Sequence, residues 1–215
     1  MSFKYAGGLP FAWNKVTKQY YFLLGKEQIK KGWKGSNKWS DFGGGRESKE
    51  QPIDTASREF YEETMGIFGN QKSIYNLMKK HKDLKVKLQN GNAYIYLLPI
   101  VKIFPNDENK KDITNLGTIF HNIVRYFRSC SRDLEGDGFQ TIPTCPNGWY
   151  EKMEIKWFSV PELYSYLILN TTKKKKKNKK IYIDQDEYVF REEFLEGLYE
   201  IFEQFPFLLE QGGGK

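Results

Sequence analysis

The distribution of apolar positions predicts several strands in the first half of the chain. Residues 6–13 (AGGLPFAW) and 19–27 (QYYFLLGKE) are rich in aromatic and aliphatic side chains, and the polar segment NKVTK between them is typical of a hairpin connection. A short strand, KWSDF, follows and ends in the glycine run 43–45. The apolar run 93–101 (AYIYLLPIV) begins a strand expected over 93–103. The run is nine residues long, as in a buried strand, and far short of the ~20 residues that span a bilayer.

Helix-boundary residues and helical spacing predict the remaining elements. Pro52 followed by Asp54 and Thr55 is typical of a helix start, and this helix is expected to run to about Met65 and to stop at Gly66. Later segments show helical spacing or strand-like runs. Helices are expected near 73–81, 116–130, 161–169 and 191–205, and strands at 154–160 and 181–190. Strands before and after a central helix, with a helix late in the chain, predict the α/β (α+β) class, arranged as a mixed sandwich.

Length and charge bound the organisation of the chain. With 215 residues it is long enough for one good core, so a single domain over residues 1–210 with a flexible tail at 211–215 is expected. The formal net charge is +7, but the run KKKKKNKK at 173–180 contains seven lysines, which leaves the rest of the chain neutral. This lysine-rich segment is expected to be a solvated loop, with contact to a polyanion as the alternative.

Cysteine usage and the N-terminal segment predict where the protein works. Cys130 and Cys145 make neither a disulfide framework nor a zinc-binding spacing, which favours two reduced thiols in an intracellular, cytoplasmic protein. The segment MSFKYAGGLPFAW lacks a basic region followed by an apolar block, so no secretory signal and no membrane partner are expected.

Three carboxylates are crowded on one side of the expected first helix. Glu59, Glu62 and Glu63 fall within an arc of roughly 100°, because each helical residue advances by about that angle. Like charges at these spacings destabilise a helix by a few tenths of a kcal/mol each. Two explanations are open for these residues alone. One is a solvated acidic face with Arg58 as its salt-bridge partner, which three glutamates by themselves favour. The other is a set of oxygen ligands for a hard divalent cation such as Mg²⁺ or Mn²⁺.

The residues around this helix favour the cation site. The pattern Gly44-x5-Glu50-x7-Arg58-Glu59-Phe60-x-Glu62-Glu63 resembles the signature of the Nudix hydrolases at every fixed position. It departs from that signature once: the family usually has glycine two residues after the second Glu of the pair, whereas here Met65 stands there and Gly66 follows. The resemblance extends to Trp39-Ser-Asp-Phe before the glycines and to the segment Glu154–Leu163.

The resemblance implies a fold and a ligand set. The fold would be a Nudix-type α/β/α sandwich with a mixed sheet, a catalytic loop and helix at 43–67, and a helical insertion at about 106–149. Glu59, Glu62 and Glu63 would be metal ligands, and Glu59 and Glu63 would also take part in catalysis. The glycine run would bring a backbone carbonyl, that of Gly43 or Gly44, toward the cation.

The resemblance also implies supporting residues. Arg58 and Glu50 would form an ion pair that orients the loop against the helix, with Gly44 allowing the tight turn. Family members often carry another catalytic or metal-binding acid in a loop shortly before the later strand. Glu151 is the candidate for that additional acid, and Glu154 is the alternative.

The implied reaction is hydrolysis of the diphosphate linkage of a nucleoside diphosphate joined to another group, with Mg²⁺ or Mn²⁺ as cofactor. The residues leave the identity of that group open. Capped RNA, and thus mRNA decapping, is the first alternative. Its phosphates would contact the lysine run through Lys173, Lys174, Lys175, Lys176 and Lys177. A Nudix-fold module that binds nucleotide or RNA without turnover is the second alternative, and retention of all three glutamates argues against it.

Overall fold

The computed structural model describes residues 3–88, 92–100, 117–125, 151–171, 181–183 and 186–210. These residues include a seven-stranded sheet, formed by β1 (Tyr5–Asn14), β2 (Gln19–Glu27), β3 (Trp39–Ser40), β4 (Phe42–Gly45), β5 (Lys85–Lys87), β6 (Ala93–Pro99) and β7 (Lys152–Ser159). The central strand order is β3-β2-β1-β6-β5, with β4 also paired to β1 and β7 also paired to β2. Strands β1 and β6 run parallel, whereas the other pairs of this sheet are antiparallel. The predicted mixed sheet is confirmed.

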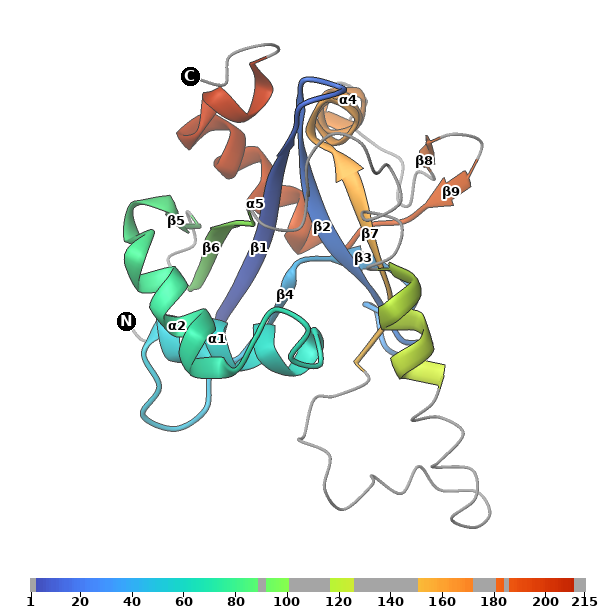
Figure 1. Ribbon diagram of the computed structural model, residues 1–215. Coiled ribbons are helices and arrows are strands. Elements are labelled where there is room, and N and C mark those ends of the chain that lie inside the picture. Colours follow the sequence, from blue (N-terminus) through green and yellow to red (C-terminus); the bar gives the residue numbers. More distant parts are fainter. Residues whose placement is uncertain are drawn as a thin grey trace.

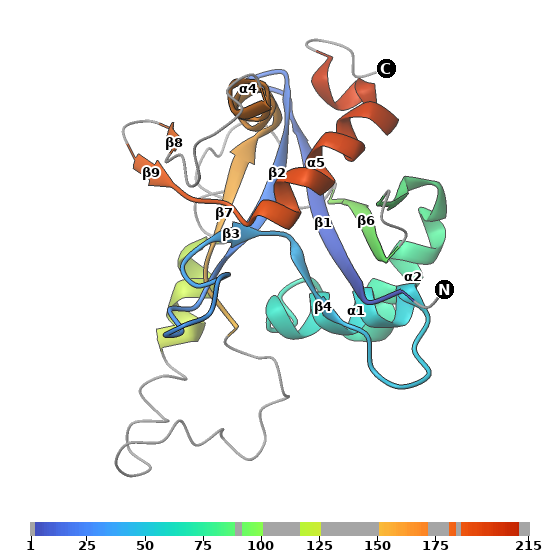
Figure 2. The same cartoon turned by 180° about the vertical axis from the view of Figure 1, so that it is seen from behind.

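Helices cover both faces of the sheet (Figures 1 and 2). The helices are α1 (Pro52–Glu63), α2 (Gln71–Lys80), a short helix over 117–125, α4 (Val160–Thr171) and α5 (Glu192–Gln204), with 3₁₀ turns at Lys82–Leu84 and Pro206–Leu209. Strand β2 shows how the layers are divided, because successive side chains of a strand point to opposite faces. Phe22 and Leu24 join the core under α4 and α5, and Leu23 joins the core under α1, α2 and the 117–125 helix. The α/β class is therefore confirmed.

Most predicted elements occur within one or two residues of their expected ends. The short strand expected at 38–42 is instead two strands, β3 paired with β2 and β4 paired with β1, and β5 was not predicted. A further prediction is also wrong. The single strand expected over 181–190 is instead a separate antiparallel pair, β8 (Ile181–Ile183) and β9 (Asp186–Tyr188). Only two residues, both polar, separate these tripeptides, and a connection of that length suits an antiparallel pair.

Several predicted segments lie wholly or partly outside the described residues. The lysine run 173–180 and the tail 211–215 lie outside them, and of the expected insertion at 106–149 only 117–125 is described. In that helix Phe120 and Val124 are buried in the α1-side core, whereas Ile119 is 50% exposed. No helix in the described part of the chain is long and apolar enough to cross a membrane.

Local sequence sets both ends of α1. Pro52 occupies the first helical turn, and the Gln51 N–H donates to Asp54 Oδ2 at 2.9 Å. At the other end Met65 and Gly66 both adopt left-handed backbone conformations, with φ of 51° and 69°. The Gly66 N–H donates to the carbonyl of Tyr61 at 2.9 Å. The residue added before Gly66 is thus accommodated after the helix has ended, and Glu59, Glu62 and Glu63 all remain within α1.

Candidate active site

The carboxylates of α1 are not a solvated acidic face. The side chains of Glu59 and Glu62 are only 12% and 16% exposed, and that of Glu63 is 2% exposed. Phe60, between them in sequence, is buried against Phe42 of β4 at 5.5 Å between ring centroids, which pins this turn of α1 to the sheet. Three acids are thus held close to the protein interior, where an unpaired carboxylate is costly.

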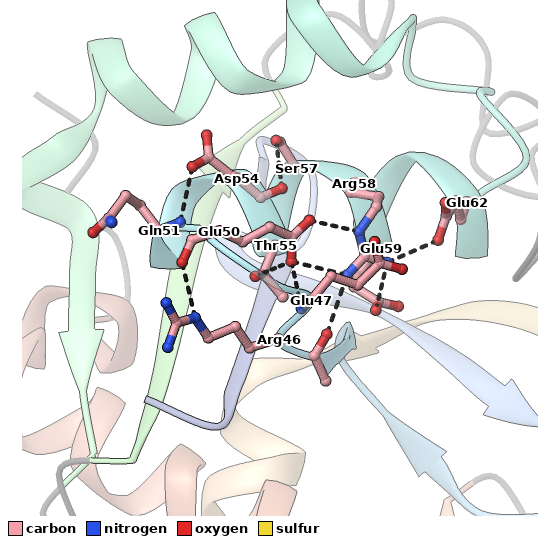
Figure 3. Close-up of polar contacts among 11 residues, drawn as sticks. Arg46, Glu47, Glu50, Gln51, Asp54, Thr55, Ser57, Arg58, Glu59 and Glu62 are labelled. Atoms are coloured by element: carbon pink, nitrogen blue, oxygen red, sulfur yellow. Dashed lines mark hydrogen bonds and ion pairs between the residues drawn. The ribbon is translucent and has the colours of Figure 1, made fainter. Parts of the chain in front are cut away.

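Arg58 joins the loop before α1 to the helix (Figure 3). Its Nε donates to Glu50 Oε1 at 2.8 Å, and its Nη2 donates to the Gly45 carbonyl at 3.1 Å. Its Nη1 donates to Glu59 Oε1 at 2.8 Å and to Glu62 Oε2 at 3.1 Å. The expected contact between Arg58 and Glu50 is therefore present, and the same guanidinium also contacts two of the three α1 acids.

Gly44 forms a cradle for Glu59. A Cβ built on Gly44 would lie 2.4–2.5 Å from the three atoms of the Glu59 carboxyl group, closer than non-bonded atoms approach. The carboxyl group therefore rests directly on the backbone of β4. Gly43, one residue earlier, lies opposite Gly7 of β1 in the antiparallel β1–β4 pair.

Glu63 enters a buried charged cluster that the sequence did not predict. Its Oε1 lies 3.3 Å from Lys152 Nζ at the start of β7, and Lys152 is fully buried. The same Nζ donates to Glu27 Oε1 at 2.6 Å, and Arg191 Nη1 reaches that oxygen at 3.3 Å. Glu27 and Lys152 are 125 residues apart, so no local pattern marks the pair. The only sequence signal was a charged residue at the end of the strand expected at 19–27 and another two residues before the strand expected at 154–160.

Burial dominates the electrostatics of the α1 acids. It raises the pKa of Glu59, raises that of Glu62 to about 7 and raises that of Glu63 well above its usual range, despite the nearby cations Arg58 and Lys152. Glu50 behaves in the opposite way: its hydrogen bond from Arg58 lowers its pKa to about 2. The α1 carboxylates thus have less compensating positive charge than their burial requires.

The two candidates for the additional acid have different surroundings. Glu151 is exposed just before β7, where its carbonyl accepts from the Gln28 N–H at 3.0 Å. Its charge is among the causes that raise the pKa of Glu59 and Glu63, so it lies near them. Glu154 lies on β7 and pairs with Lys26 at 3.8 Å on the sheet surface. The lysines at 173–177 lie outside the described residues.

The donor set suits a hard cation, although its side chains do not converge as they lie. Among the described residues, no three His, Cys, Asp or Glu side chains are arranged to hold a metal ion. Arg58 Nη1 contacts both Glu59 and Glu62 instead. Glu63 Oε2, however, is a buried oxygen without a hydrogen-bond partner among the described residues. Such an atom, beside further carboxylates, fits an oxygen-ligated cation.

Comparisons with known proteins give matches among solved structures alone. No family model matches the chain, and no curated protein matches it. A Nudix hydrolase from M. smegmatis, RenU, aligns over 96% of this chain and 88% of its own, with 11% identity and a TM-score of 0.41. A mutT/nudix family protein from Listeria innocua aligns over 96% of both chains, with 14% identity and a TM-score of 0.40. A C. elegans Ap4A hydrolase aligns over 59% of this chain and 99% of its own, with 16% identity and a TM-score of 0.31.

Two of these three structures carry the name of the family whose signature the segment Gly44–Glu63 resembles. All three TM-scores are below 0.5, and all three identities are below 25%.

Proposed function

We propose that the chain is a Nudix diphosphohydrolase that uses Mg²⁺ or Mn²⁺ to cleave the diphosphate linkage of a nucleoside diphosphate joined to another group. One observation carries this proposal: the side chains of Glu59, Glu62 and Glu63 on α1 are largely shielded from water. They lie beside the loop that Arg58 connects to the helix. A solvated acidic face would leave these side chains exposed, and it would not require the cradle at Gly44.

Charge counting supports a cation at this site. The buried and mostly buried carboxylates of the region outnumber its cationic groups by six to three, which leaves a formal charge of −3 when all are ionised. The carboxylates are Glu27, Asp41, Glu50, Glu59, Glu62 and Glu63, and the cations are Arg58, Lys152 and Arg191. A divalent cation would offset two of these charges.

Glu59, Glu62 and Glu63 would hold the metal, which would neutralise phosphate oxygens and lower the pKa of a water nucleophile. Arg58 would keep its Nε bond to Glu50 if Nη1 released Glu59 and Glu62, so the loop would stay in place while the two carboxylates turned to the metal. Glu151, exposed beside them, would accept the proton of the attacking water.

One surface favours capped RNA as a second candidate substrate. The segment 28–38 between β2 and β3 carries four lysines and no acid, and Lys30, Lys31 and Lys34 are exposed. Trp33 is 39% exposed, with Lys30 Nζ 5.4 Å from its ring centroid. Gln28 bonds to Glu151, so this basic and aromatic segment adjoins the candidate acid. Cations beside an accessible indole suit phosphates and a stacked base.

A release screen tests the function. The protein is incubated with Mg²⁺ or Mn²⁺ and a panel of nucleoside diphosphate derivatives and cap-labelled RNA, and products are separated with and without chelator. Turnover should require metal, and Glu62→Gln and Glu63→Gln should each reduce it severely while circular dichroism stays unchanged. Glu47→Gln is the matched control, because Glu47 is 70% exposed and lies 4.0 Å from the same Arg58.

The outcomes separate the three candidate functions. Turnover that survives chelation, or normal turnover in both α1 variants, refutes the metal site. Binding of nucleotide without turnover of any substrate supports the non-catalytic module. If capped RNA is the substrate, replacing Lys30, Lys31 and Lys34 by serine should raise its KM and flatten its salt dependence. The log–log slope should fall by ~0.7 for each phosphate that the lysines no longer neutralise.

A further inference from the structure

Lys152 is surrounded by acceptors deep inside the protein. Its Nζ donates to Glu27 Oε1 at 2.6 Å and to Ser40 Oγ at 2.9 Å, and lies 3.3 Å from Glu63 Oε1. An ammonium has three N–H donors, and three oxygens from three separate elements, β2, β3 and α1, face them here. The position of the ammonium is therefore defined by the sheet and the helix together.

Two features of the sheet bring Lys152 to the α1 face. Regular pairing between β2 and β7 ends in a register shift: Lys26 faces Glu154, but Glu27 faces Lys152. Met153 is the extra residue on β7. In a regular strand Lys152 would point to the same face as Lys156 and Phe158, but the extra residue turns it to the opposite face.

Gly25 provides the second feature. A Cβ built on Gly25 would lie 2.8 Å from Lys152 Cδ and 2.9 Å from its Cγ. Only a glycine at position 25 leaves room for the lysine stem against the sheet. The register shift and Gly25 together place the Lys152 side chain on the α1 face of the sheet.

Stability alone does not account for this arrangement. A buried ion pair is often no better for stability than apolar residues of the same volume, because both charges lose their hydration. The arrangement instead makes the two carboxylate oxygens of Glu63 differ in their contacts. Oε1 is held by Lys152, while Oε2 is buried and finds no hydrogen-bond partner among the described residues. One oxygen is fixed and the other remains available to a ligand.

We infer that Lys152 is a positioning residue, whose buried ammonium fixes Glu63 so that Oε2 faces the cation bound by the α1 acids. The inference rests on the function proposed above. Glu27 already neutralises Lys152, and Ser40 and Arg191 hold Glu27 in turn at 2.9 and 3.3 Å. The contact therefore orients Glu63 without cancelling its attraction for a cation.

The test measures Mn²⁺ binding in the absence of substrate, by electron paramagnetic resonance of the free ion, together with thermal unfolding. Lys152→Met keeps the stem and removes the donors, and it should weaken Mn²⁺ binding by ~10–100-fold, as loss of a residue that orients a metal ligand commonly does. Lys156→Met is the matched control, because Lys156 lies on the same strand and contacts Tyr188 on the opposite face. It should bind Mn²⁺ as the wild type does.

A double variant separates positioning from folding. Lys152→Met with Glu27→Gln removes both charges of the buried Lys152–Glu27 pair, so it should recover part of the thermal stability that Lys152→Met alone loses. Its Mn²⁺ affinity should stay low, because nothing then fixes Glu63. The inference is overturned if the double variant recovers both thermal stability and Mn²⁺ affinity. It is also overturned if Lys152→Met binds Mn²⁺ with wild-type affinity. If the wild type itself binds no Mn²⁺, the proposed function fails and the inference fails with it. Wild-type binding without an effect of Lys152→Met refutes the inference alone.

Discussion

Gly44→Ala should separate turnover from stability. The new Cβ would meet the Glu59 carboxyl group at 2.4–2.5 Å, whereas ordinary contact begins at 3.4 Å, so the carboxyl group must retreat by about 1 Å. That group is the far end of a flexible side chain and can move without disturbing the backbone. A misplacement of this size at a reacting centre can reduce the rate ~10²-fold. We therefore expect kcat to fall by about that factor, with little change in the unfolding temperature.

Gly45→Ala is the control for this prediction, because a Cβ on Gly45 meets nothing within 4 Å. Both variants are assayed by steady-state hydrolysis of the best substrate from the release screen and by thermal unfolding. Gly45→Ala should match the wild type in both measurements. Wild-type kcat in Gly44→Ala would show that Glu59 need not rest on β4, and the role assigned to this acid would then be wrong.

Three further predictions concern other residues. Glu151→Gln should lower turnover by ~10²–10⁴-fold, as loss of a general base does, whereas Glu154→Gln should matter less; the reverse ranking in steady-state assays would exchange their roles. Because the pKa of Glu50 is lowered to about 2 when folded, its ionised form stabilises the protein above pH ~4.5, and this stabilisation is lost as pH falls toward 2. Denaturant unfolding of wild type and Glu50→Gln should thus differ at neutral pH and converge near pH 2. Gly8→Ala places a Cβ 2.9 Å from the Phe60 ring, and this overpacking should lower the unfolding free energy by about 1–3 kcal/mol in denaturant titrations.

Features that depend on neighbouring residues could be predicted from the sequence. The start of α1 follows from Pro52 and Asp54, and its end before Gly66 follows from the left-handed backbone that glycine allows. The three glutamates of the candidate site share one helix, so helical periodicity alone brings them to one side. Their burial did not follow from the sequence, because it depends on how α1 packs against β1 and β4.

Features that depend on distant residues could not be predicted in this way. Lys152 follows an expected loop and precedes an expected strand, and its buried position depends on a register shift against β2 that leaves no mark in the pattern of apolar residues. The two-stranded pair at 181–188 was missed because the apolar segments IYI at 181–183 and YVF at 188–190, with four polar residues between them, resemble one continuous strand. In both cases strand pairing decided the outcome.

The charged contacts that run from Arg191 through Glu27 and Lys152 to Glu63 connect the segment before α5 with α1 across the sheet. In evolutionary terms, these positions are constrained as a group. A relative that has lost the lysine at position 152 should also have replaced the acid at position 27, because the buried Glu27 would then keep only the more exposed Arg191 as a cationic partner. The glycine at position 25 would then be free to vary, because it no longer has to leave room for the lysine stem.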